Sequence, residues 1–451
     1  MTAVAPSRGL PTLGRSEIRR LLGGVAIGLL IALITGPSGS GDDPYRGFQG
    51  SLLEPRVIPY VIFGLLFGAV LIAVDRGLFK NRMPATLTSN VGTPIASVRR
   101  LFRDNRAVRY GALALALAVA IYYPTTLAPF WQGVLVEQIG IFVLLALGLN
   151  IVVGLAGLLD LGFIAFFAIG AYTTAYFTGS LPVQPPVVLN ALLVIPIAIV
   201  VAMIAGVILG GPTLRLRGDY LAIVTLGFGE IVRILAVNGD NFFGVNVTDG
   251  PRGASIPSLS IDLGPLEYEF GLKTLPYYYL VLAFTILVVI GFRNLEHSRV
   301  GRAWTAIRED EVAAAATGVP TVRYKLLAFS IGAATSGLGG VLYASKVGFF
   351  APDNFLLIQS ILVLTMVIFG GMGSIAGVIL GAALLQWLPQ VLRDYVPQED
   401  RFIYFGALLV VMMIFRPQGL LPSRRRAREI RMAEAGIGGA DGTGPTPGTT
   451  Q

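Results

Sequence analysis

The sequence contains no cysteine, a single histidine and few charged residues. Of its 451 residues, 13% are charged and 54% are hydrophobic, with a mean hydropathy of +0.72. The absence of cysteine excludes a disulfide framework, a thiolate metal site and a cysteine nucleophile, and the lone His297 excludes a multi-histidine metal cluster. Soluble domains carry about 25% charged residues, so this shortage of charge indicates a chain embedded in a membrane.

Sequence patterns for nucleotide hydrolysis and for common hydrolytic sites are also missing. No G-x-x-x-x-G-K-[ST] sequence is present, because Gly271-Leu272-Lys273-Thr274 lacks the upstream glycine. No nucleophile elbow G-x-S-x-G and no H-E-x-x-H occurs either. We therefore expect a protein that is not an enzyme and that holds no metal or cofactor of its own. Any energy for transport would come from an ion gradient or from another subunit.

Long apolar runs predict about twelve membrane-spanning helices, since a hydrocarbon core of about 30 Å requires about 20 mostly apolar residues per helix. The runs cover residues 21–36, 57–74, 108–128, 134–153, 163–179, 187–210, 219–237, 276–292, 326–345, 358–371, 374–389 and 402–415. We predict an all-α, polytopic transmembrane bundle of about ten core helices, preceded by two extra N-terminal helices.

The distribution of basic residues predicts the orientation of these helices. An even number of passes places both termini on one side, and most of the 34 Lys and Arg residues fall in the termini and in the connections on that side. Cytoplasmic connections are enriched in Lys and Arg, so both termini are predicted to be cytoplasmic in a bacterial inner membrane. The net charge of +8 then reflects topology rather than nucleic-acid binding.

Three regions are predicted along the chain. Residues 1–107 form an N-terminal module with two transmembrane helices and a basic loop, residues 108–422 form the transmembrane core, and residues 423–451 form a cytoplasmic tail. The first part of the tail is basic and is expected to lie on the lipid surface. Its end is rich in Gly, Thr and Pro and is expected to be disordered.

Glycine is concentrated in two clusters of similar spacing, at residues 148–162 and 370–381. Matched glycine interruptions in two halves are typical of inverted-repeat transport proteins, in which broken helices line the pathway. Close packing of helices through small residues also explains such clusters, and it requires no pathway. The residues predicted to break helices or to line a pathway are Asn150, Gly154, Gly157, Asp160, Gly162, Tyr172, Glu230, Arg233, Gly370, Gly371 and Gly373.

Ionisable residues inside the predicted spans are few. Glu230 and Arg233 lie three residues apart and share a helix face, so they either line a pathway or neutralise each other as a local ion pair. Asp160 is predicted near the cytoplasmic end of a broken helix. It is either part of a pathway or a hydrated aspartate at the membrane interface.

A charged connection, residues 293–325, is predicted to hold a short amphipathic helix. Residues 303–316 are good helix formers, and Gly318 and Pro320 follow as stop signals. Such a helix either seats in a groove of a cytoplasmic partner or lies at the membrane surface. On the opposite side of the membrane, residues 238–275 form a connection that is long enough to bind a partner.

The charged connection resembles the coupling loop of ABC importer permeases, in which Glu-Ala-Ala is followed a few residues later by Gly. Its counterparts here are Glu311, the four alanines after Val312, and Gly318, with a one-residue difference in spacing. Further blocks resemble the M-type permease of branched-chain amino acid ABC importers, and they are residues 148–150, 168–172, 214–233, 301–311, 369–374 and 416–422.

This resemblance implies a permease that moves leucine, isoleucine or valine by alternating access. It implies four kinds of partner: membrane lipid, a homologous second permease of the H type, two cytoplasmic ATPase subunits that bind the ATP, and a periplasmic binding protein. The residues implied to couple to the ATPase are Arg308, Glu309, Asp310, Glu311, Ala314, Ala315 and Gly318. Urea and short-amide permeases share this architecture and remain an alternative, as does a self-sufficient secondary transporter.

Overall fold

The computed structural model describes residues 117–118, 120–213, 219–241, 244–263, 266–270, 274–391, 393, 406, 410, 412 and 419–421. The chain divides into two compact units, Met1–Ala118 and Val119–Gln451, and almost all described residues belong to the second. The first two predicted spans, residues 108–116 of the third, most of the last, residues 214–218 and the tail lie outside the described residues. The predicted three-region division therefore stays a prediction.

Helices make up most of the described residues of the second unit. The described helices are α6 (Pro129–Gly133), α7 (Ile141–Leu149), α8 (Ile164–Phe177), α9 (Ala191–Thr213), α10 (Asp219–Val237), α11 (Thr274–Glu296), α12 (Arg299–Glu309), α13 (Glu311–Ala316), α14 (Thr321–Val347), α15 (Leu357–Gly370) and α16 (Ile375–Val391). Two π-helical segments, η2 (Val134–Gly140) and η3 (Asn150–Leu155), extend α7 at both ends. Short 3-10 helices are η1 (Tyr123–Thr126), η4 (Gly239–Asn241), η5 (Gly250–Arg252) and η6 (Pro352–Phe355).

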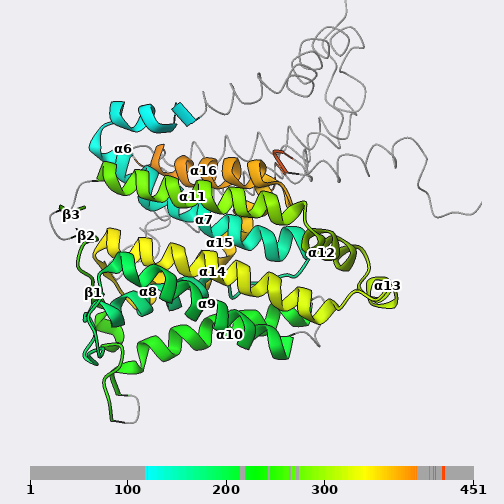
Figure 1. The fold of residues 1–451 in the computed structure, drawn as a ribbon, viewed down its shortest axis with the longest axis horizontal. Helices are drawn as coiled ribbons and strands as arrows, with labels where there is room; N and C mark the ends of the chain where they lie inside the picture. Colours follow the sequence, from blue (N-terminus) through cyan, green and yellow to red (C-terminus); the bar gives the residue numbers. More distant parts are fainter. Residues whose placement is uncertain are drawn as a thin grey trace, which may run out of the picture. The chain divides into compact units, whose positions relative to one another are not determined.

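Four short strands lie at one end of the helices. β1 (Ala254–Ser255) pairs antiparallel with β4 (Phe349–Phe350), with Ala254 opposite Phe350, and β2 (Ser260–Leu263) pairs antiparallel with β3 (Leu266–Glu269). We call this end the hairpin end. α12 and α13 lie at the opposite end, which we call the α12–α13 end (Figure 1).

Six of the described helices are long and apolar enough to cross a membrane. They are Pro129–Leu155, Ala191–Pro212, Tyr220–Val237, Thr274–Glu296, Thr321–Val347 and Pro352–Gly370, and the shorter apolar helices Ile164–Phe177 and Ile375–Val391 accompany them. Each follows a predicted run to within a few residues, and α10 has the predicted bounds. The prediction of a polytopic all-α bundle is confirmed. The number of spans in the whole chain and the inverted repeat stay predictions.

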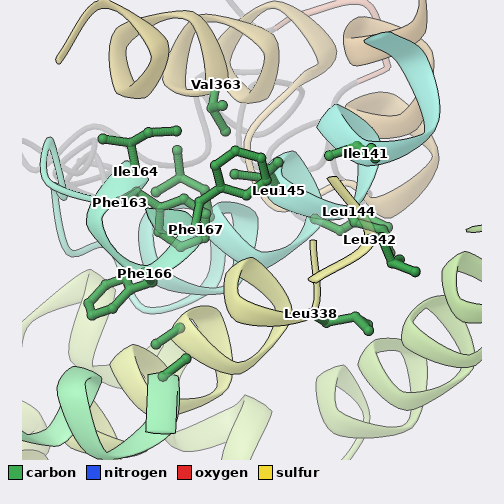
Figure 2. Close-up of a cluster of buried hydrophobic side chains, with 14 of the residues drawn as sticks. Ile141, Leu144, Leu145, Phe163, Ile164, Phe166, Phe167, Leu338, Leu342 and Val363 are labelled. Carbon is green, nitrogen blue, oxygen red and sulfur yellow. The ribbon is translucent and has the colours of Figure 1, made fainter. Parts of the chain in front are cut away.

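Helix α14 packs against α7, α8 and α9 in the interior of this unit. Small residues on α14 allow the close approach: a Cβ added to Gly337 would lie 2.6 Å from the Cβ of Ala202, and one added to Gly340 would lie 2.8 Å from the amide nitrogen of Ala171. Small residues let helix backbones approach closely in membrane bundles. Large apolar side chains of α7 and α8 fill the remaining space beside α14 and α15 (Figure 2).

The outward faces of α9 and α10 are apolar as well. On α9, Val200, Ile204 and Ile208 are exposed at intervals of four residues and so lie on one helix face. Ile231 and Ile234 are exposed in the same way on α10. An apolar outer surface fits helices that face lipid or another membrane subunit.

Candidate functional site at the α12–α13 end

Helix α12 lies on the bundle through one face. Ser298 begins the helix, because its Oγ accepts hydrogen bonds from the amides of Val300 at 3.1 Å and Gly301 at 3.4 Å. Trp304 is fully buried, and its indole nitrogen donates to the carbonyl of Tyr324 in α14 at 2.7 Å. Ile307 is buried three residues later. The spacing of three puts both side chains on one face, which fixes α12 against α14.

The prediction of a single helix over residues 303–316 is wrong, because the structure has two helices that meet at Asp310. Asp310 has an extended backbone with φ −155° and ψ 111°, and its Oδ1 accepts the amide hydrogens of Val312 at 2.8 Å and Ala313 at 3.0 Å. Aspartate competes for nearby amides in this way and stabilises a helix start by about 1 kcal/mol. Gly318 follows α13 with φ +86°, in keeping with the predicted stop.

Helix α13 is fixed to the bundle by an ion pair. Oε1 of Glu311 lies 2.5 Å from Nζ of Lys325, whose side chain is only 5% exposed. A buried ammonium group requires such a partner, because removing an unpaired charge from water is costly. Ala314 also faces the bundle, whereas Val312 and Ala315 are exposed. α13 therefore presents small apolar side chains outward from a fixed attachment.

Arg308, in the last turn of α12, reaches the first glycine cluster. Its Nη1 donates a hydrogen bond to the carbonyl of Gly154 in η3. Its aliphatic stem lies against Gly157, where an added Cβ would be 2.6 Å from the Cγ of Arg308. Gly157 also has φ +72°, which side-chain-bearing residues rarely adopt. Both the backbone and the arginine stem therefore require glycine at position 157.

The two glycine clusters meet at the same place. Oδ1 of the buried Asn150 accepts the amide hydrogen of Gly373 at 2.8 Å, although the two residues are 223 positions apart in the chain. A Cβ added to Gly154 would overlap this Oδ1 and lie 2.6 Å from the Gly373 nitrogen. We call Asn150, Gly154, Gly157 and Gly373 the glycine junction. Arg308 connects it to α12.

The second cluster also forms a tight turn between α15 and α16. A Cβ added to Gly370 would overlap the carbonyl of Gly377, so close helix packing explains the glycine at 370. Gly371 has φ +113° and turns the chain after α15. Packing through small residues and interruption of helices thus occur together in this cluster.

Asp160 lies in the segment between η3 and α8 and is fully buried, so the prediction of a hydrated interfacial aspartate is wrong. Its Oδ1 accepts the amide hydrogen of Gly162 at 2.9 Å, and its Oδ2 has no hydrogen-bond partner among the residues that the structure describes. Gly162 lies so close to α10 that an added Cβ would overlap the carbonyl of Thr225. Asp160 thereby shapes a tightly packed turn, and its part in a pathway stays a prediction.

Three predicted pathway residues lie toward the hairpin end, away from the glycine junction. Arg233 pairs with Glu230, with Nε 3.0 Å from Oε1, and this confirms the local ion pair. The ring of Tyr172 packs against Phe350 and Phe355, with centroids 5.1 Å and 6.1 Å away. The structure leaves the contribution of all three to a pathway as a prediction.

Sequence reasoning missed three polar residues that hold this region together. Lys325 pairs with Glu311, the hydroxyl of Thr225 accepts the Leu161 amide at 3.0 Å, and that of Ser360 accepts the Ile164 amide at 3.0 Å. Lys325 stands at the start of an apolar run, fourteen residues after Glu311, and this position could have indicated that the two side chains pair. Nothing in the local sequence marks the other two.

The apolar helices and the small-residue packing between them indicate a multi-pass membrane protein. Residues 134–416 match the family described as branched-chain amino acid transport system / permease component, and the chain belongs to that family. The resemblance read from the sequence motifs is therefore confirmed.

Individual relatives agree with this family. Over 319 residues the chain is 43% identical to the high-affinity branched-chain amino acid transport system permease protein LivM of Escherichia coli strain K12 and of Salmonella typhimurium, a match that covers 65% of this chain and 71% of each relative. It is also 28% identical over 181 residues to the permease protein LivH of Escherichia coli strain K12, covering 39% of this chain and 58% of that relative. No solved structure matches the chain.

Proposed function

We propose that this chain is the membrane-spanning subunit of an ATP-driven importer of leucine, isoleucine and valine in a bacterial inner membrane. The observation that carries the proposal is the family match over residues 134–416, which includes the α12–α13 segment and both glycine clusters. The 43% identity to LivM supports the choice of substrate. The subunit binds no ATP itself, and two partner ATPase subunits supply the energy.

The α12–α13 end is the proposed cytoplasmic end, where the ATPase docks. Basic residues gather there, which supports this orientation, and they are Arg293, Arg299, Arg302, Arg308, Arg323 and Lys325. Val312 is 60% exposed on α13, beside the exposed Ala313 and Ala315. A small apolar face on a helix outside the spans fits a groove in a partner protein. The anchoring of α12 and α13 on α14 means that a displaced α13 would pull on the bundle.

The remaining partners follow from the same proposal. The similarity to LivH supports pairing with a homologous second permease, which would cover part of the apolar outer faces. The hairpin end then faces the periplasm. The connection between α10 and α11 offers Asp240 and Asp249 on that side as polar contacts for a substrate-binding protein.

Reconstitution tests the transport function. Proteoliposomes that contain this chain, the second permease, the ATPase subunits and the binding protein are expected to take up radiolabelled leucine only with ATP, and a protonophore should leave uptake unchanged. Proteoliposomes with this chain alone should show no uptake. Protonophore-sensitive uptake by the chain alone would instead identify a secondary transporter. ATP-dependent uptake of urea or acetamide, without uptake of leucine, would identify a short-amide permease.

Docking is tested by one substitution at each end of the molecule. Val312→Asp puts a charge into the proposed apolar contact and should abolish co-purification of the ATPase with the permease. The same change at Val245, which is 52% exposed near the hairpin end, serves as the matched control and should leave co-purification intact. Equal co-purification of both variants would reject α13 as the docking site.

A further inference from the structure

Arg308 is an exposed residue at the end of α12, yet its guanidinium reaches the carbonyl of a buried residue at the end of another helix. It donates to the carbonyl of Gly154 across 154 positions of the chain. Arg302, on the same helix, bonds instead to the nearby carbonyl of His297 at 3.3 Å. The two arginines share one short helix and have different attachments. Only one of them joins α12 to a membrane-embedded helix.

The carbonyl that Arg308 contacts lies at the C-terminal end of a helix. Gly154 lies among the last residues of η3, where helix carbonyls lack an intrahelical amide donor and attract cations. An arginine fork is well suited to such a carbonyl, since its donors are fixed in a plane and remain charged. The contact therefore holds the end of the α7–η3 helix by a charged group that belongs to α12.

The stem of Arg308 makes a second contact with the segment that follows. Because Gly157 offers only a hydrogen atom to the stem at close range, the arginine is confined on two sides, by the Gly154 carbonyl and by the Gly157 backbone. A movement of the end of α12 relative to α7 would break one of these contacts or carry the segment between η3 and α8 with it. That segment contains Leu159 and the buried Asp160.

The contacts continue into the second half of the chain. Gly154 touches the amide group of Asn150, which receives the Gly373 amide hydrogen in the turn between α15 and α16. Arg308, Gly154, Asn150 and Gly373 thus connect α12 with both helix interruptions. Asn150 and Gly373 lie so close to Gly154 that they exclude an additional side-chain atom there. Packed contacts of this kind transmit displacement because they cannot deform gradually.

The geometry points to Arg308 as the positioning residue that transmits ATPase-driven movement of α12–α13 to the glycine junction, and so to both interrupted helices. This inference rests on the proposed function. It assigns docking of the ATPase to α13 and transmission of the resulting movement to Arg308. Loss of Arg308 should leave the complex assembled while hydrolysis of ATP no longer opens the pathway.

The absence of cysteine from the chain makes a site-specific test possible. Leu159→Cys reports on the segment between η3 and α8, since Leu159 is 37% exposed, and Val312→Cys reports on docking. Each reporter is introduced alone into the complete transporter in lipid nanodiscs, and its reaction rate with a polar maleimide is measured with and without a non-hydrolysable ATP analogue. With Arg308 present, the nucleotide should change the rate at position 159 roughly fivefold or more, in the range of allosteric coupling.

Arg308→Gln should abolish the nucleotide effect at position 159 and retain the protection of position 312 by the docked ATPase. Leucine transported per ATP hydrolysed should fall in the same variant. Arg308→Lys keeps a cationic donor and should restore part of both responses. Arg302→Gln is the matched control on the same helix and should behave like the unmodified protein. If Arg308 were only structural, Arg308→Gln would reduce both the nucleotide effect at position 159 and the protection of position 312.

The outcomes separate this inference from the proposed function. If the unmodified complex shows no ATP-dependent leucine uptake, the proposed function fails. If it does show uptake and Arg308→Gln keeps the nucleotide effect at position 159, the inference is overturned. Should Arg308→Gln fail to assemble, Gly157→Ala replaces it, since the added methyl group displaces the arginine stem. Normal transport per ATP in an assembled Gly157→Ala complex would likewise overturn the inference.

Discussion

The glycine junction and the exposed ion pairs of the hairpin end are contacts of different kinds. At the α12–α13 end, the glycine junction joins residues up to 223 positions apart and leaves no space for a further carbon atom at Gly154. At the hairpin end, Arg233 pairs with Asp353 at 3.5 Å and Arg252 pairs with Asp249 at 3.8 Å. Each of these two ion pairs includes a side chain that is more than four-fifths exposed.

This difference determines what each end tolerates. Exposed ion pairs contribute about 0–1 kcal/mol, whereas forcing additional atoms into a packed contact costs about 1–3 kcal/mol. Substitutions in the glycine junction should therefore alter folding and coupling, and substitutions of the exposed ion-pair residues at the hairpin end should alter little. Substitutions at four positions test this contrast, in order of decreasing expected effect.

Gly154→Val should have the largest effect. The valine would overlap Asn150 and separate it from the Gly373 amide, so overpacking and the loss of a buried hydrogen bond together cost about 4 kcal/mol. Thermal unfolding of the detergent-purified subunit measures the loss. Gly227→Val is the matched control, because an added Cβ at this helical glycine meets no atom within 4 Å. Equal unfolding midpoints for the two variants would contradict the described junction.

Glu311→Ala should rank second, because it leaves Lys325 buried without its partner. Breaking a buried pair costs about 3–5 kcal/mol, and the partial exposure of Glu311 reduces the expected loss to about 2–3 kcal/mol. The double variant Glu311→Ala/Lys325→Met removes both charges and should recover most of this loss in the same unfolding measurement. If the stability loss of the double variant equals the sum of the losses of Glu311→Ala and Lys325→Met measured singly, the two side chains do not interact.

Asp160 variants should have a smaller effect. Asp160→Ala removes the acceptor for the Gly162 amide and should cost about 1–2 kcal/mol, whereas Asp160→Asn keeps an acceptor oxygen and should cost less than about 1 kcal/mol. Leucine uptake, measured together with stability, distinguishes a structural role of Asp160 from a role in the transport pathway. Full stability with abolished uptake in Asp160→Asn would indicate that the carboxyl group belongs to the pathway.

Arg252→Ala should have the smallest effect. The side chain of Arg252 is 83% exposed and its ion pair with Asp249 is 3.8 Å long, so the expected change in stability is below about 0.5 kcal/mol. Unfolding midpoints and leucine uptake should both match the unmodified protein. A large loss of uptake with unchanged stability would place Arg252 in the contact with the binding protein and would weaken the contrast between the two ends.

Much of the fold follows from local sequence. The runs of apolar residues predict the spans, and the predicted bounds of residues 219–237 coincide with those of α10, because a charged residue begins this run and glycine follows it soon after. The pairing of Glu230 with Arg233 also follows from a spacing of three on one helix. These features depend on neighbours within one or two turns.

The candidate site was only partly predictable, since it depends on contacts between distant segments. The glycine clusters and the Arg308 segment were recognised separately, but no local pattern indicates that the Gly373 amide meets Asn150 or that Arg308 bonds to Gly154. The break at Asp310 was missed because good helix formers surround it, and its effect comes from the hydrogen bonds of one side chain. The burial of Asp160 depends on α10 packing against it, which is again a long-range property.

Helices α8 and α9 meet α14 through glycine and alanine, as at Gly170 against Gly337 and at Ala202 against the same residue. At these glycine and alanine contacts, no large side chain has to change rotamer when one helix moves lengthwise along another. Conformational change in the subunit is therefore expected to occur by shear, in which α14 slides between its neighbours by small steps, rather than by rotation of a domain about a hinge.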